Sequence, residues 1–225
     1  MSVPIQRLIG VLGIVYVVVT IAPALFLPPP PPGGAPVDEV AGYYLGHRDA
    51  LLISGWVGLL AFPLGFGFLA GLALLLAGEG KMSNWLVAIS LLSISVTLAT
   101  AAVQGILALA VPYVSTSARP DELKLLADVT QLGFSAAFVF ETSYFIVTGA
   151  LGLLFRKLPR SLSLLSFIVA AVALLASLGV VVRLGALTAG GPVTLVALVA
   201  GLGWWLLAAV LLVVRPRQAT ALIGV

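Results

Sequence analysis

The stretch Val193–Val214, VTLVALVAGLGWWLLAAVLLVV, decides the fold class of this chain. It contains no charged residue, and its length matches the roughly 20 apolar residues that a helix needs to cross the hydrocarbon core of a bilayer. The strands of a membrane β-barrel are shorter and alternate between apolar and polar residues, a pattern that this stretch lacks. We therefore interpret it as a transmembrane α-helix.

Five similar runs precede it, and together the six predict an all-α fold. The chain is expected to be a single polytopic membrane helix bundle that spans residues 1–225. Short connections at Gly78–Asn84 and Arg156–Ser161 predict that the helices they join are antiparallel neighbours. The six predicted spans are Leu8–Phe26, Ala50–Ala77, Trp85–Ala110, Gln131–Phe155, Leu162–Val182 and Val193–Val214.

The composition supports a membrane location and excludes several classes of function. Hydrophobic residues make up 61% of the chain and charged residues only 8%, whereas soluble domains carry about 25% charged residues. The absence of cysteine and the presence of one histidine exclude disulfides, thiolate metal sites and a haem held by two histidines of this chain. The net charge of +3 is too small to indicate nucleic-acid binding. We expect no metal, no cofactor and no catalytic residue of the kind that soluble enzymes use.

The distribution of basic residues predicts the orientation, because cytoplasmic loops of membrane proteins are enriched in lysine and arginine. Seven basic residues fall on one side of a six-span chain and four on the other, so we expect both termini to be cytoplasmic. The first group is Arg7, Lys81, Arg156, Lys157, Arg160, Arg215 and Arg217; the second is Arg48, Arg119, Lys124 and Arg183.

The two longer connections lie on the predicted outer side and carry local structural signals. Pro28–Pro32 is interpreted as a stiff polyproline spacer, with a PxxP-type ligand as the alternative. The segment Val37–Arg48 is expected to form a short interfacial helix. Pro120, followed by two acidic residues, is a helix start. A helix that runs from Pro120 through the fourth span would be about 50 Å long.

Glu141, within Phe138–Phe145 (FVFETSYF), is the main candidate for a functional group. A carboxyl group deep in a membrane is costly and marks a functional site by default. Without an opposite charge nearby, desolvation should keep it protonated. Gln104 lies at a similar depth on the preceding span, and we expect its side chain to meet Glu141. A buried acid with a purely structural role is the alternative.

The third span carries a polar stripe that could line a cavity beside Glu141. The expected ligand-binding set therefore comprises Glu141, Gln104, Arg183, Thr100 and Thr97, although such a stripe also serves simple helix–helix packing. Arg183, near the outer end of the fifth span, either extends to the membrane surface or pairs with Glu141 or Asp128. The stripe consists of Ser90, Ser93, Thr97, Thr100 and Gln104.

One segment carries a resemblance to known proteins. The stretch Glu39–Leu52, with Tyr43-Tyr44 and His47-Arg48 before an apolar span, resembles a group of bacterial six-span membrane proteins that are frequent in actinobacteria and have no settled activity. The resemblance implies a bacterial cytoplasmic (inner) membrane location. It assigns no functional residue.

Three kinds of function remain open at the level of sequence. The first is the binding or transport of a small molecule or lipid along a polar seam between the third and fourth spans. The second is a non-catalytic subunit or assembly factor, whose partners would cover the glycine-rich face of the second span and the outer loops. The third is a membrane-embedded enzyme. It has the least support, because one carboxylate and one histidine on separate segments are few groups for catalysis.

Overall fold

The structure is a computed structural model that describes residues 3–32, 34–182 and 185–214. All regular elements in these ranges are helices, which confirms the predicted all-α fold. They are α1 (Val3–Ile21), η1 (Ala22–Leu25), α2 (Val37–Gly46), α3 (Arg48–Leu76), α4 (Lys81–Val114), α5 (Pro120–Leu154), α6 (Arg160–Ser177), η2 (Leu178–Val180) and α7 (Pro192–Val214).

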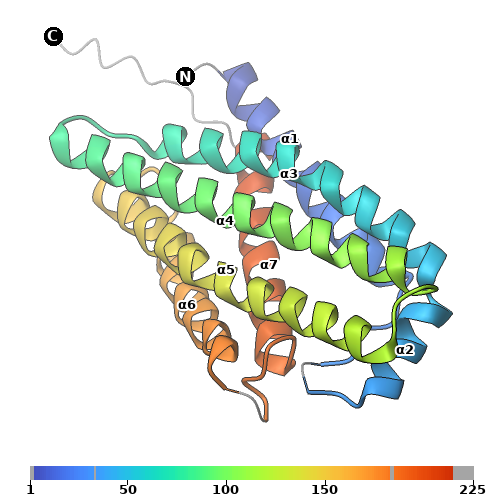
Figure 1. Cartoon of the computed structure of the whole chain (residues 1–225). Coiled ribbons are helices and arrows are strands. Elements are labelled where there is room, and N and C mark those ends of the chain that lie inside the picture. Colours follow the sequence, from blue (N-terminus) through green and yellow to red (C-terminus); the bar gives the residue numbers. More distant parts are fainter. Residues whose placement is uncertain (1–2, 33, 183–184, 215–225) are drawn as a thin grey trace, which may run out of the picture.

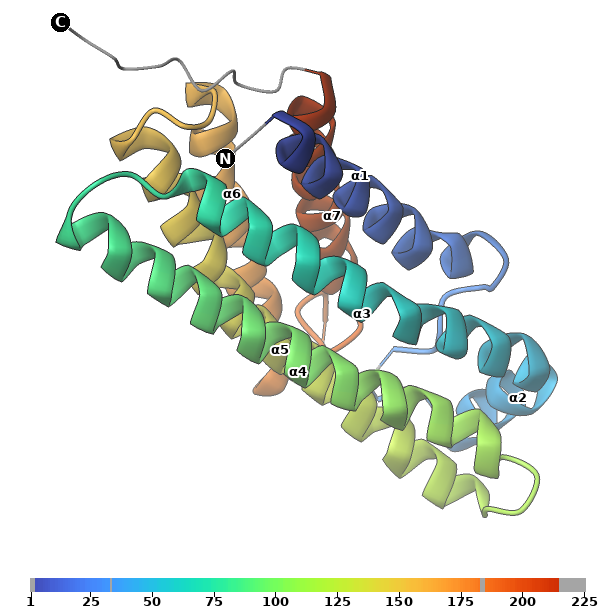
Figure 2. The same ribbon diagram turned by 90° about the horizontal axis from the view of Figure 1, so that it is seen from above.

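Six of the helices in the described ranges are long and apolar enough to cross a membrane, as predicted. Of the α-helices in the described ranges, α2 is the one too short to span, and it lies between the first two spans. The helices α4 and α5 contain 34 and 35 residues, which at 1.5 Å per residue makes each about 51–52 Å long. Both run obliquely to α6 and α7 in Figures 1 and 2. Both extend toward the end of the bundle where α2 lies.

The six spans form a closed ring in chain order. Each span packs against the next one along the chain, and α1 also packs against α7, so that the first and last spans complete the ring. Figure 2 shows α1 lying beside both α3 and α7. Short turns explain the antiparallel neighbours, and the α1–α7 contact is the long-range one that closes the bundle.

Large side chains fill the middle of the ring. Phe68 from α3, Tyr144 from α5 and Trp204 from α7 are each at most 1% exposed. The Trp204 indole Nε1 donates a 3.0 Å hydrogen bond to the backbone carbonyl of Leu162 on α6. Trp204 thus acts as a packing group that joins two spans.

Glycine residues let α1 approach its two neighbours closely. A Cβ atom at Gly71 of α3 would lie 2.9 Å from the side chain of Ile9, so Gly71 leaves the room that Ile9 occupies. A Cβ atom at Gly10 of α1 would lie 2.7 Å from the carbonyl oxygen of Ala209 on α7. The glycine-rich face of the second span therefore packs within this chain.

The helix α2 forms a small cap where α4 ends and α5 begins. The helix predicted within Val37–Arg48 is thus confirmed, and its location at the membrane interface stays a prediction. Val40 and Tyr44 are buried against Leu123 and Ala127 of α5 and form a second hydrophobic cluster. The Tyr43 hydroxyl donates a 2.8 Å hydrogen bond to the carbonyl of Pro28, which ties the proline run to α2.

The predicted single long helix is confirmed in α5. Pro120 begins it, and the Glu122 carboxylate accepts a 3.0 Å hydrogen bond from the backbone N–H of Arg119. An acceptor at this position satisfies a helix N–H group that would otherwise have no partner. The helix then continues without interruption to Leu154, and its second half carries Glu141 into the ring.

Candidate functional site

Glu141 lies inside the ring with its carboxyl group directed toward α7. Its side chain is buried, with 8% of the residue exposed. A Cβ atom at Gly201 of α7 would lie 2.8 Å from Oε1 of Glu141, so the carboxyl oxygen occupies the space left by the missing side chain of Gly201. Within the described residues the Glu141 carboxyl makes no ion pair and no hydrogen bond.

Three residues from different spans meet at the depth of Glu141. Thirteen residues separate Glu141 from Leu154 and likewise Gly201 from Val214, at the ends of α5 and α7. The same number separates Tyr16 from Val3, where α1 begins. Since these three ends lie on the same side of the bundle, each residue is about 20 Å from that side. The Tyr16 phenol lies within electrostatic range of Glu141.

Aromatic rings surround this position. Trp205 of α7 stacks on Phe145 of α5, with ring centroids 5.7 Å apart and planes inclined by 20°. The ring of Tyr16 lies 5.6 Å from that of Trp205. The indole Nε1 of Trp205 is buried and has no hydrogen-bond partner among the described residues. The junction of α1, α5 and α7 thus holds a carboxyl group and an N–H donor that both lack partners among the residues that the structure describes.

The expected contact between Gln104 and Glu141 is not formed. The amide group of Gln104 lies against Gly133 of α5, where it occupies the space of the missing side chain. Gly133 and Glu141 are eight residues apart, which corresponds to about 12 Å along the helix. Gln104 therefore does meet the fourth span, but at a position about two turns nearer the start of α5. The buried Oε1 of Gln104 has no hydrogen-bond partner in the described part of the chain.

The other predicted ligand-binding residues are distributed along α4 or lie outside the described ranges. Thr97 is buried, and its hydroxyl donates a 2.9 Å hydrogen bond to the Ser93 carbonyl of its own helix. Such a bond to the helix's own backbone is expected if the polar stripe of α4 serves helix–helix packing. Thr100 is half-buried one turn further along. Arg183 lies outside the described residues, and Asp128 pairs with Lys124 at 2.7 Å.

Sequence reasoning missed Tyr16, Gly201 and Trp205 as the surroundings of Glu141. It searched for partners on the adjacent third span, because consecutive spans are neighbours. The signal that could have found them is the equal distance of the three residues from one side of the membrane. That signal only becomes useful once ring closure is known, because only then do side chains of α1 and α7 meet those of α5 in the interior of the ring.

A second polar cluster lies outside the membrane-spanning part, where α2 packs on α5. Burial raises the pKa of the Tyr44 hydroxyl to about 12, with smaller contributions from Tyr43 and from the negative charge of Asp128. Tyr44 therefore remains neutral at physiological pH and acts as a packing group of the cap. His47 Nδ1 lies 2.9 Å from the Tyr43 carbonyl, which places it at the end of α2. No group of three or more potential metal ligands occurs among the described residues.

Comparison of the chain with protein-family models, with curated proteins and with solved structures gives no match in any of the three. The class of this protein is therefore assigned from its fold. The chain is a multi-pass integral membrane protein with six membrane-spanning helices.

Proposed function

We propose that this protein binds a small molecule or lipid inside the membrane at the junction of α1, α5 and α7. The observation that carries the proposal is the buried carboxyl group of Glu141, which lies in a glycine-made recess without a partner among the described residues. An ionisable residue inside a membrane is costly and is a functional candidate by default. Within the described part of the chain, no hydrogen bond or ion pair of the carboxyl group offsets that cost.

The surroundings of Glu141 indicate the chemistry of the ligand. A neutral carboxyl group offers one donor and an acceptor, and the Trp205 N–H offers a second donor. The rings of Tyr16, Phe145 and Trp205 supply an apolar, polarisable wall. These groups favour a ligand with a hydroxyl or carbonyl group on a flat or flexible apolar body. The site replaces the seam between the third and fourth spans as the centre of the binding hypothesis.

The recess can be tested with two matched pairs of variants. Glu141→Gln removes the carboxyl group, and Gly201→Ala fills the recess with a methyl group. Their controls are Glu39→Gln, an exposed carboxyl group on α2, and Gly203→Ala on the same helix as Gly201, where an added Cβ atom has no atom within 4 Å. The measurement is native mass spectrometry of the purified proteins, which detects molecules that remain bound.

The expected result is an adduct that wild type and both controls retain and that Glu141→Gln and Gly201→Ala lose. Native spectra that are the same for all five proteins would count against a ligand site at Glu141. In that case the carboxyl group would be only a buried acid, the structural alternative.

The subunit or assembly-factor hypothesis receives less support. It expected partners to cover the glycine-rich face of the second span, but Ile9 of α1 occupies the space at Gly71. Any partner chain would therefore use a different surface. We further propose, from the Glu39–Leu52 resemblance, that the membrane is the bacterial cytoplasmic membrane.

A further inference from the structure

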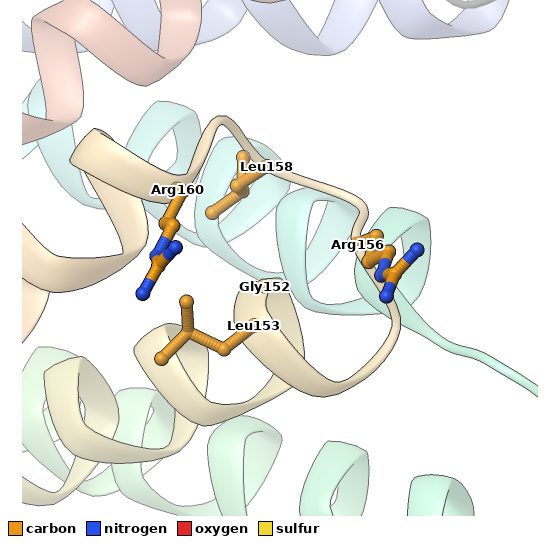
Figure 3. A pocket seen from close by; sticks show the side chains of 5 residues that line it. All are labelled: Gly152, Leu153, Arg156, Leu158 and Arg160. Carbon is orange, nitrogen blue, oxygen red and sulfur yellow. The ribbon is translucent and has the colours of Figure 1, made fainter.

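A hollow lies at the opposite end of the bundle from α2, at the turn between α5 and α6. It has a volume of about 470 Å³. Five residues line it: Gly152, Leu153, Arg156, Leu158 and Arg160. Figure 3 shows Arg160 extending from α6 toward Leu153, while Arg156 lies on the turn at the other side of the hollow. The lining therefore combines two guanidinium groups with two leucine side chains.

The positive charges of this turn are not neutralised within the described part of the chain. Neither Arg156 nor Arg160 forms an ion pair there, although three ion pairs occur elsewhere. Lys157 lies between them in sequence and is also exposed and unpaired. Three positive charges within five residues attract an anion.

The backbone around the hollow adds to this preference. Helix α6 follows Pro159, whose side chain cannot accept a hydrogen bond, so its first N–H groups lack a side-chain cap. Free N–H groups at a helix start favour negative charge. Arg156 adopts a left-handed backbone conformation with φ of 53°, the only non-glycine residue of the described ranges to do so. Glycine would adopt that conformation at lower cost, so Arg156 at this position lowers the stability of the turn.

The position of the hollow in the fold indicates which kind of molecule would supply the anion. Leu154 ends one membrane span and Arg160 begins the next, so the hollow lies at the level of the lipid head groups. Phospholipids supply phosphate at this level on either side of a bilayer, and the leucine side chains offer contact for the glycerol and upper acyl chain. We infer that the hollow at the α5–α6 turn binds the head group of an anionic phospholipid, through Arg156 and Arg160. This inference does not depend on a ligand at Glu141.

The test compares the binding of two lipids to the purified full-length protein in detergent micelles. Phosphatidylglycerol carries a net negative charge and phosphatidylcholine does not, and native mass spectrometry counts the lipids bound at each concentration. We expect wild type to prefer phosphatidylglycerol. Arg156→Gln and Arg160→Gln should each weaken that binding by about fivefold, because one basic residue contributes about that factor at an anionic membrane surface.

Lys81→Gln is the matched control, since Lys81 is exposed at the start of α4 and does not line the hollow. Lys81→Gln also removes one positive charge, but it should change the affinity for phosphatidylglycerol by less than about twofold. Circular dichroism and the thermal transition of each variant show whether it is folded, and all three exposed side chains are expected to be replaceable without unfolding.

Three outcomes would overturn the inference. An equal loss in Lys81→Gln and Arg160→Gln, or no preference of wild type between the two lipids, would show that the hollow is not a lipid site. Displacement of phosphatidylglycerol by millimolar inorganic phosphate would show that the hollow takes a free phosphate ion instead of a lipid head group.

Discussion

At the scale of single residues, Glu141 combines burial with the absence of a bonding partner among the described residues. A buried polar group that makes no hydrogen bond typically costs about 1–3 kcal/mol. Removal of the Glu141 carboxyl group should therefore affect stability, separately from any effect on ligand binding.

Glu141→Leu is expected to leave the free energy of unfolding unchanged or to raise it by up to about 2 kcal/mol, because the unpaired polar group is removed. Thermal unfolding of the purified protein in detergent is the measurement. Phe145→Ala, which removes a fully buried ring beside it, serves as the control and should cost about 3–5 kcal/mol. A loss of more than about 2 kcal/mol in Glu141→Leu would mean that the carboxyl group has a structural partner.

Trp204 makes the opposite prediction, because its indole N–H has a partner. Trp204→Phe removes the 3.0 Å hydrogen bond to Leu162 and leaves a cavity in the centre of the ring. It should destabilise the protein by about 2–4 kcal/mol. The same change at Trp56, which is 61% exposed on the lipid-facing surface, should have little effect on the thermal transition. Similar losses at both positions would contradict the central packing role of Trp204.

At the scale of helices, local signals predicted each element well. Apolar runs located the six spans, and Pro120 with its acidic neighbours located the start of α5, because both signals act within a few residues. The direction in which Glu141 points was predicted wrongly, because we expected the carboxyl group to meet Gln104 of α4 and it lies at Gly201 of α7. A helical period shows which residues share a face, but it does not show whether that face meets α4 or α7.

The contact between α1 and α7 depends on a glycine that a methyl group would disturb. In Gly10→Ala the new Cβ atom would lie 2.7 Å from the Ala209 carbonyl oxygen, which belongs to the backbone and cannot rotate away. We expect a loss of about 1–3 kcal/mol, the usual cost of overpacking. Gly58→Ala on α3, where an added Cβ atom has no atom within 4 Å, should instead be neutral or stabilise by about 0.5–1 kcal/mol.

Thermal unfolding in detergent compares the two substitutions directly. If Gly10→Ala proved as stable as Gly58→Ala, the close approach of α1 and α7 would be wrong. The comparison thus tests ring closure without any knowledge of the ligand.

At the scale of the whole molecule, the orientation in the membrane is a prediction from the charges of the loops. The chain contains no cysteine, so single cysteines can be introduced for labelling. Thr116→Cys, in the exposed turn between α4 and α5, should react with a membrane-impermeant maleimide added to intact cells. Lys81→Cys, at the other end of the bundle, should react only after the cells are permeabilised. The reverse pattern would place the termini outside the cytoplasm.

The closed arrangement also could not be predicted from the sequence. Short turns determine which consecutive spans are neighbours, whereas the α1–α7 contact joins segments almost 200 residues apart. Its sequence signals, Gly10 and Ala209, are small residues that are common in any apolar helix. Only the packed structure shows that they meet, and hence that Tyr16 and Gly201 lie beside Glu141.

Ring closure has a consequence for the biosynthesis of this protein. The chain is made from its N-terminus, so α1 enters the membrane long before the ribosome has produced α7. During that interval the face of α1 that contains Gly10 has only lipid, an insertion factor or another nascent span as its neighbour. The ring can be completed only after translation of Val214. A product truncated before Pro192 would leave the Gly10 face of α1 uncovered, where membrane proteases could recognise it.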